Sequence, residues 1–306
     1  MMRKEMRKIV LLPLLVFLSA FTVLPLQAQP SVNVNNFLLW GSTGYSRISN
    51  NAPDTKASGR NGMALGGGYE MHFTNFLLQT GLELSYYTSD MSLKDTLVSV
   101  PMVDTEGNSY TGQFTFQHTT DRQSIFNVGI PLMFGYESPE GMYFAIGGKA
   151  MLNLTGRSKT TTYVTSTAYY DDLIGDNNNG IQSNMPDHGL TSEWRTVKSS
   201  FHLQTLFFGS IEAGYTLGKN PEDFSLSNKP KIRLSVFCDY GFAPVATKDK
   251  TDNLFVNTSN SGEYLPAIQS YLLHNLQTNR LNVLYAGLKV TVLFGIKKYS
   301  CHCTKE

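Results

Sequence analysis

The sequence predicts an all-β protein, a transmembrane antiparallel up-and-down β-barrel of about eight strands with long extracellular loops and short periplasmic turns. Three observations predict this fold. Segments of about ten residues or more alternate apolar and polar side chains, which is the pattern of a strand between lipid and a polar interior. The connections between these segments alternate between long and short, and a basic and then apolar leader precedes them all.

The composition agrees with strands that face lipid. Of the 306 residues only 16% are charged, whereas 12% are aromatic and 26 are glycine. Low charge with many aromatic residues and glycines is typical of membrane-facing sheets. The mean hydropathy of −0.18 and the lack of a long apolar run after residue 30 exclude a membrane protein made of several helices.

Residues 1–28 are predicted to be a signal peptide. Four basic residues lie within residues 1–8, residues 9–26 are apolar, and Ala28 is a small residue before a polar start. This order is that of a secretory signal. The alternative is an uncleaved membrane anchor, but Pro13 and Pro25 interrupt its apolar stretch, which is near the lower length limit for spanning. Removal of the signal leaves 21 basic and 23 acidic residues, a net charge of about −2, and no basic tract for nucleic acid.

Eight alternating segments follow the leader. The last is the clearest, because seven apolar residues from Leu284 to Ile296 occupy every second position. The first segment has no evident apolar face. Pro131 lies within the fourth, and because proline lacks a backbone donor we expect a bulge or irregularity there. In chain order the predicted strands cover residues 36–45, 63–73, 78–87, 126–136, 144–154, 201–217, 232–240 and 284–296.

The connections between the predicted strands provide an independent test. Residues 74–75 and 137–141 are short turns, and residues 218–230 form a shorter connection than those on either side of it. The connection at residues 46–61 is of medium length, and those at 88–122, 156–197 and 243–279 are long. Outer-membrane barrels have short periplasmic turns, long external loops and both termini in the periplasm. The alternation of loop lengths therefore predicts the same fold as the strand pattern.

Outward-facing aromatic residues gather at the ends of the strands nearest the short turns. Aromatic rings settle at the boundary between membrane and water, so this set indicates a periplasmic girdle. The alternative is a soluble β-sandwich with an aromatic core, and the single apolar face of each long strand and the unequal loops count against it. The girdle residues are Phe73, Phe76, Tyr136, Phe144, Tyr215 and Phe294.

The segments GLELSYY, FNVGIPLMFGYE and LYAGLKVTVLFGIKKYSCHC, together with the signal peptide, resemble the outer-membrane β-barrel domains common in the Bacteroidota, which include the PorT-like and OmpA-barrel-like proteins. The resemblance covers residues 29–306. It implies an outer-membrane location and a final strand that signals to the barrel-assembly machinery, carried by Gly287, Val290, Val292 and Phe294. The chain departs from this pattern because a tail, residues 297–306, follows the strand.

The polar face of the predicted strands carries charged residues that would point into the barrel. An eight-stranded barrel is only wide enough for its own side chains or a narrow channel, and charges in such a lumen are costly unless they are paired. We therefore expect a structural ion-pair network that plugs the lumen, with a gated ion or proton path as the alternative. The residues of this predicted network are Glu70, His72, Glu83, Lys149, Glu212, Arg233, Asp239 and Lys289.

The sequence contains no evident set of catalytic residues. A hydrolase requires a nucleophile, a base and an orienting acid within reach of one another. Ser200 and His202 share a face at the external end of their strand, but no acid accompanies them, so we expect no enzyme. Cys301, His302 and Cys303 are one ligand short of a zinc site, and we expect a tail without metal or cofactor.

These features predict a non-enzymatic envelope protein with a structural role, a PorT-like accessory role in secretion, or a role in interactions through its surface loops. The alternatives are a narrow channel for small solutes or ions and an outer-membrane hydrolase. The expected partners are outer-membrane lipid and lipopolysaccharide, the barrel-assembly machinery, and a secretion-system or surface partner that contacts the loops; nucleic acid is not expected. The loops, rich in Asp, Asn, Ser, Thr and Tyr, suit partner or glycan binding and equally suit solvated covers. The predicted organisation is signal peptide 1–28, barrel 29–296 and periplasmic tail 297–306.

Overall fold

The computed structural model describes residues 35–50, 55–103, 107, 109–169, 181–182, 192–201, 203–218, 230–244, 256–258, 264–266 and 280–296. The regular secondary structure of these residues is entirely β. Among them, no helix is long and apolar enough to cross a membrane. The predicted signal peptide, the predicted tail with its two cysteines, and His202 lie outside the described residues.

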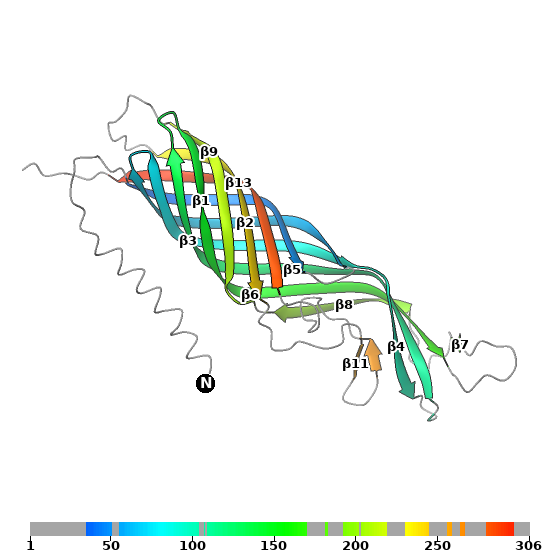
Figure 1. The fold of residues 1–306 in the computed structure, drawn as a ribbon. Helices are drawn as coiled ribbons and strands as arrows, with labels where there is room; N and C mark the ends of the chain where they lie inside the picture. The colour runs from blue at the N-terminus through cyan, green and yellow to red at the C-terminus, as the bar shows by residue number, and fades with distance from the viewer. Residues whose placement is uncertain are drawn as a thin grey trace, which may run out of the picture. The chain divides into compact units, whose positions relative to one another are not determined.

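Eight strands form a closed antiparallel ring. The ring can be followed in Figure 1. Each strand pairs with the next around the ring, and β1 pairs with β13 to close it. The predicted all-β class, antiparallel pairing and ring of eight strands are confirmed. The ring strands are β1 (Asn35–Asn50), β2 (Thr55–Phe73), β3 (Phe76–Leu93), β5 (Ser109–Glu137), β6 (Met142–Tyr169), β9 (Leu206–Leu217), β10 (Lys231–Pro244) and β13 (Arg280–Ile296).

The sheet continues beyond the ring, where the sequence predicted loops at residues 88–122 and 156–197. The prolonged β5 carries β4 (Thr96–Val103), and the prolonged β6 carries β7 (Ile181–Gln182) and β8 (Ser192–Phe201). The prediction of loops was wrong because β-branched residues run through this part of β6 and keep the strand extended; buried positions such as Thr160 and Val164 alternate there with partly exposed ones. Within 243–279, β11 (Val256–Thr258) and β12 (Tyr264–Pro266) pair only with each other among the described strands.

The predicted strand 201–217 is also corrected. β8 ends at Phe201 and β9 begins at Leu206, with a break between them. Phe201 and Leu203 share the parity of Phe207 in the sequence, but they are buried in the core, whereas Phe207 is exposed. Odd-numbered residues are the more buried ones at the end of β8 and the exposed ones in β9 after the break. The apolar residues on the two sides of the break therefore do not belong to one face.

One end of the ring carries the short connections. Thr74 adopts a left-handed φ of 62° in the two-residue turn between β2 and β3. Between β5 and β6, Gly141 has a φ of 100°, where glycine is favoured over other residues, and its N–H donates to the Ser138 carbonyl at 3.0 Å. The first residue of β1 and the last of β13 pair at this same end.

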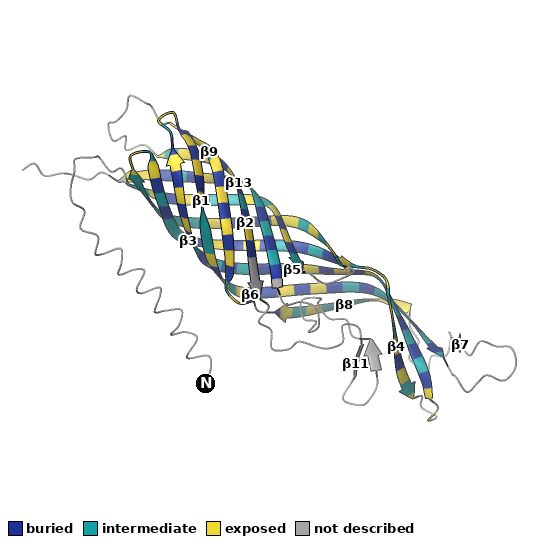
Figure 2. Cartoon of the chain, viewed as in Figure 1, coloured by how far each residue is buried: buried dark blue, intermediate teal, exposed yellow. Residues whose placement is uncertain are grey.

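Burial alternates residue by residue around the ring, as the stripes in Figure 2 show. One parity points into the ring and is buried, and the other points out and carries large exposed apolar side chains. Examples of the outward set are Leu39, Leu65, Leu82 and Val236, each more than half exposed. The ring is therefore apolar outside, and its polar and charged residues lie inside.

Pro131 interrupts one ladder without a bulge. Opposite Pro131 and Ile130, the pairing of β5 with β3 is missing at Gly81 and Leu82, and the register on either side is unchanged. This matches the lost backbone donor, and of the bulge or irregularity expected there the ladder shows an interruption without a bulge. Register shifts occur elsewhere: within β2 between Gly59 and Met63, and in the β5–β6 ladder at Gln117/Thr120 and Phe126/Asn127.

Candidate functional site

The eight charged residues that the sequence placed in the lumen all lie inside the ring and are buried or half-buried. They form three groups along the ring, each with a basic residue bound to at least one acid. The first group lies at the short-turn end, and the other two follow it toward the sheet extension.

Arg233 is the centre of the group at the short-turn end. Its guanidinium donates to both carboxylate oxygens of Glu70, with Nη1 to Oε2 at 2.7 Å and Nη2 to Oε1 at 3.3 Å. It also donates to Glu137 at 3.4 Å and to the Thr216 hydroxyl at 3.0 Å, and it lies 3.9 Å from the centre of the Tyr143 ring. Arg233 and Glu70 are fully buried, so the pairing is what makes the burial of both charges tolerable.

Further polar residues complete the shell around Glu70. Asn36 Nδ2 and Gln79 Nε2 each donate to its carboxylate, at 2.9 and 2.5 Å, and His72 Nε2 lies 2.6 Å from Glu70 Oε1. Together with Arg233, Glu137, Tyr143 and Thr216, these side chains come from seven of the eight ring strands. The group therefore ties the ring walls together at this end.

Glu70, His72 and Glu137 also satisfy the spacing of a metal site, since one ligand atom from each lies within 4.8 Å of the others. Both carboxylates already accept hydrogen bonds from Arg233. The guanidinium therefore supplies the positive charge that a cation would bring, and a metal would have to displace it. The arrangement fits an ion-pair cluster better than a metal centre.

The other two groups are built around lysines. Lys289 Nζ donates to Glu212 at 2.7 Å, and the same carboxylate accepts from the Ser235 hydroxyl at 2.6 Å. Lys149 Nζ bridges Glu83 at 2.9 Å and Asp239 at 2.8 Å, and thereby links β6 to β3 and β10.

Two neutral donors complete the Lys149 group. The Trp40 indole N–H donates to Glu83 at 3.0 Å, and the Ser210 hydroxyl donates to Asp239. Each acid in the two lysine groups thus has a cation and a neutral donor.

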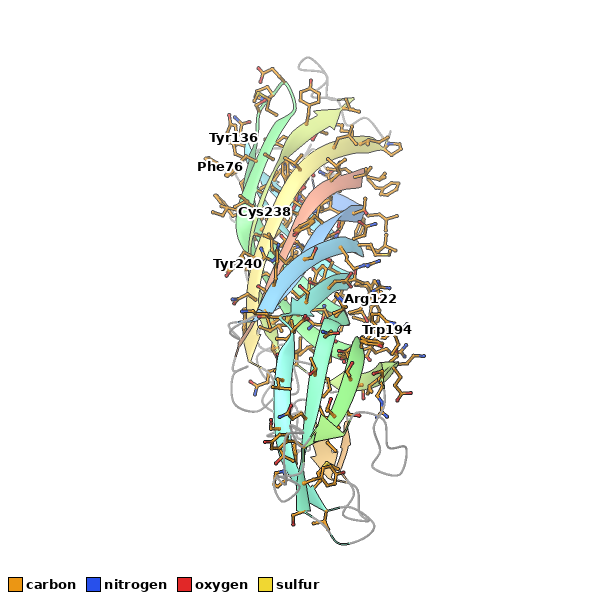
Figure 3. The ribbon with its side chains drawn as sticks, turned by 90° about the vertical axis from the view of Figure 1, so that its right-hand side faces the viewer. Phe76, Arg122, Tyr136, Trp194, Cys238 and Tyr240 are labelled. Carbon is orange, nitrogen blue, oxygen red and sulfur yellow. The ribbon has the colours of Figure 1, made fainter. Side chains whose placement is uncertain are left out.

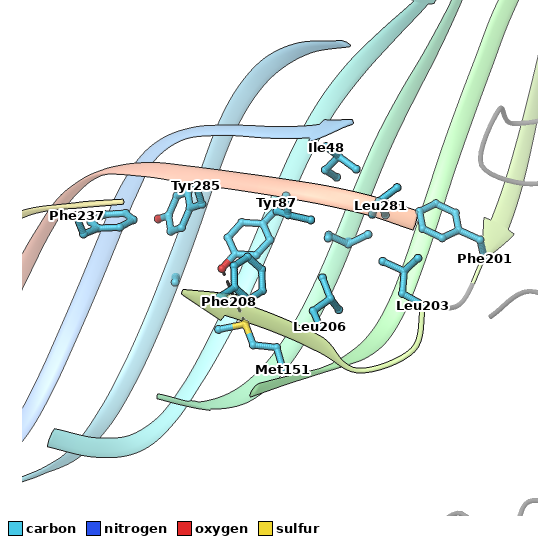
Figure 4. Packing of buried hydrophobic residues seen from close by; sticks show 13 residues of the cluster. Ile48, Tyr87, Met151, Phe201, Leu203, Leu206, Phe208, Phe237, Leu281 and Tyr285 are labelled. Atoms are coloured by element: carbon cyan, nitrogen blue, oxygen red, sulfur yellow. Dashed lines mark hydrogen bonds between the residues drawn. The ribbon is translucent and has the colours of Figure 1, made fainter. Parts of the chain in front are cut away.

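Little free space remains in the interior. A cavity of about 20 Å³ lies among Trp40, Glu83, Lys149 and Lys289, which is room for about one water molecule. Beyond the charged groups, aromatic and aliphatic side chains fill the ring, as Figure 4 shows. The ring centroids of Tyr87 and Tyr285, both fully buried, are 4.8 Å apart.

Sequence reasoning missed several members of this interior. Glu137 was assigned to the turn, although it continues the inward parity of Met133 and Gly135 and could have been found from it. Trp40 was missed because the first predicted strand had no clear apolar face; its inward side carries Trp40 beside Leu38, and its outward side carries Leu39.

Among the described residues, the remaining candidates take no part in the three charged groups. Ser200 is exposed on β8, on the face opposite to buried Phe201, and its suggested partner His202 lies outside the described residues. His118 stacks on Trp194 with centroids 6.5 Å apart. The assembly-signal residues Gly287, Val290, Val292 and Phe294 lie on β13, the strand that closes the ring.

The comparisons with known proteins give no family. No protein-family model matches the chain, and no curated protein matches it.

Proposed function

We propose that the chain is an outer-membrane β-barrel protein with a closed lumen and a non-enzymatic role in the cell envelope. The observation that carries the proposal is the inverted distribution of side chains in the ring. Large apolar residues are exposed on the outside, whereas Arg233, Glu70 and Asp239 are fully buried inside. A water-soluble ring would lose stability by exposing that surface, and a lipid environment covers it.

The dimensions of the apolar surface support this environment. On most ring strands the outward apolar stretch runs over nine to eleven residues, for example Phe37–Tyr45 on β1 and Leu284–Phe294 on β13. A membrane-spanning strand needs about 9–11 residues. The stretches on the eight strands therefore form one continuous band of the length required.

Aromatic side chains lie at both ends of the band. Phe76 and Tyr136 contact each other at the short-turn end, with centroids 5.7 Å apart, and Tyr240 is exposed further along (Figure 3). Tyr45 on β1 and Tyr86 on β3, the strands on either side of β2, lie near Tyr240's end of the band. Two aromatic belts are typical of barrels in a membrane, and the sequence had indicated only one of them.

The filled interior supports a closed barrel over a channel. The Arg233, Lys289 and Lys149 groups and the packed Tyr87 and Tyr285 rings occupy the path through the ring. The sheet extension then provides a surface beyond the membrane. Its role would be structural or accessory to secretion, as the resemblance to PorT-like barrels also suggests.

Cell fractionation tests the proposal. The mature chain should sediment with the outer membrane, lack residues 1 to about 28, and migrate faster on electrophoresis when it is not boiled. Recovery as a soluble periplasmic protein, or in the inner membrane with residues 1–28 retained, would overturn it.

A further inference from the structure

A concave surface of about 1010 Å³ lies on the outer face of the sheet, where the ring passes into the extension. Five basic residues line it: Arg60, Arg122, Arg157, Lys159 and Lys198. They come from four strands, β2, β5, β6 and β8. The proposed lumen network uses none of them.

Irregularities in the strands shape this surface. The register shift in β2 between Gly59 and Met63 leaves Arg60 and Asn61 both exposed, and in β6 the shift at Phe126/Asn127 falls beside Arg157. The break between β8 and β9 follows Ser200. Bulges bend a sheet and re-aim side chains, and here they turn several cations toward one concavity.

The register places three of the cations in one row. Asp90 on β3 is opposite Arg122 on β5, Arg122 is opposite Lys159 on β6, and Lys159 is opposite Lys198 on β8. Like charges directly opposite each other on neighbouring strands are destabilising. A row of this kind therefore lowers the stability of the fold unless an anion neutralises it.

The acids among the described residues offset only part of this charge. Asp90 binds Arg60 at 2.8 Å and Arg122 at 3.1 Å. Among the described residues, no carboxylate lies within ion-pair distance of Arg157, Lys159 or Lys198. These three cations face the concavity together.

The surface changes in steps from apolar to basic. Tyr86 is opposite Phe126 at the edge of the apolar band, the next outward row holds Thr88, Ser124 and Arg157, and the row after it holds Arg122 and Lys159. An amphiphile in the outer leaflet would place its acyl chains on the band, its polar headgroup against the hydroxyls and its anionic groups on the cations.

We propose that this concavity binds the headgroup of a phosphorylated, acylated glycolipid of the outer leaflet, with Arg157, Lys159 and Lys198 holding its phosphates. Arg and Lys form charge-assisted hydrogen bonds to phosphate oxygens, and Arg does so with two parallel bonds. The inference rests on the proposed membrane location, because that location brings such a lipid to this height of the ring.

Native mass spectrometry of the detergent-solubilised full chain tests the site, with diphosphoryl lipid A as the probe. The variant R157Q/K159Q/K198Q should bind the probe roughly tenfold more weakly or worse, since each lost charge-assisted contact weakens binding by about that factor. The control K56Q/K94Q/K231Q removes three positive charges that do not line the concavity and should bind like the wild type.

Further arms distinguish the ligand sources and the structural explanation. Dephosphorylated lipid A should bind weakly, and pyrophosphate at equal phosphate concentration should not displace diphosphoryl lipid A. The variant R157Q/K159Q/K198Q should melt at the same temperature as the wild type or higher, because it removes the repulsion between cations on neighbouring strands.

Equal affinity of the two triple variants for diphosphoryl lipid A would overturn the site and leave the membrane location standing. If pyrophosphate alone displaces diphosphoryl lipid A, the ligand of the site is a free phosphate compound and the lipid proposal is overturned. A chain found soluble in the periplasm would overturn the membrane location, and the lipid site with it.

Discussion

Arg233 and Glu70 meet across the interior of the ring, although β13 and β1 lie between their strands in the sheet. Their hydrogen bonds of 2.7 and 3.3 Å therefore join walls that backbone pairing does not join directly. Since both side chains are fully buried, neither charge can turn to water when the other is removed.

Replacement of Arg233 by methionine should strongly destabilise the folded chain in detergent. Breaking a buried pair costs about 3–5 kcal/mol, because it leaves an uncompensated charge, whereas replacing both members can be nearly neutral. The double variant R233M/E70Q should therefore recover much of the thermal stability. R233M/E212Q is the matched control, since Glu212 pairs with Lys289. If R233M/E70Q and R233M/E212Q recover thermal stability equally, the specific pairing of Arg233 with Glu70 is contradicted.

A positive charge on the outside of the ring distinguishes lipid from water around it. Leu82, on the apolar band, is 62% exposed, and Leu97, on β4 beyond the ring, is 58% exposed. In a bilayer L82R should cost about 2–4 kcal/mol, the range for a cation near the midplane of a barrel. L97R should have little effect. Chemical denaturation of both variants refolded into vesicles gives the comparison, and similar stabilities would count against the membrane band.

Epitope insertions test which end of the ring faces outward. A tag at Gly107, between β4 and β5, should be reached by antibody on intact cells. A tag at Glu140, in the short turn between β5 and β6, should be reached only after the outer membrane is permeabilised. The opposite pattern would reverse the proposed orientation.

The wild-type chain should give no steady conductance in a planar bilayer, because charged groups and packed aromatic rings fill its interior. A large porin in the same bilayer serves as the positive control. If the wild type conducts, and K149M changes that conductance while K56M on the outer surface does not, the proposal of a closed lumen is wrong. The narrow channel then takes its place.

The period of two in the sequence assigned eight charged residues to the inside of the ring, although it missed Glu137. Lys149 and Asp239 were both placed correctly by parity alone. Their pairing could not be predicted, because it depends on the register between strands that are distant in the chain. Arg233 illustrates this, since any of four predicted acids could have been its partner, and Glu137 was an unlisted fifth.

Parity failed where the strands are irregular. One extra residue reverses the face of every side chain that follows, and no residue type marks that position reliably. His118, with a φ of 52° at a register shift in β5, is an example. The alternation around Phe201 and Leu203 matched that of β9 only by coincidence, and the extension was missed because its polar, Thr-rich strands resemble loops in composition.

The pairing of β1 with β13 has a consequence for how the chain reaches its native state. It joins residues from opposite ends of the described sequence, such as Asn35 and Ile296, and so depends on the least local contacts in the sheet. Contacts of this kind form slowly, because a long stretch of chain must be brought together first. Until β13 arrives, β1 and β10 each present an unpaired edge that can recruit strands from other molecules. Production of this protein therefore depends on protecting an open sheet from aggregation until its last strand is in place.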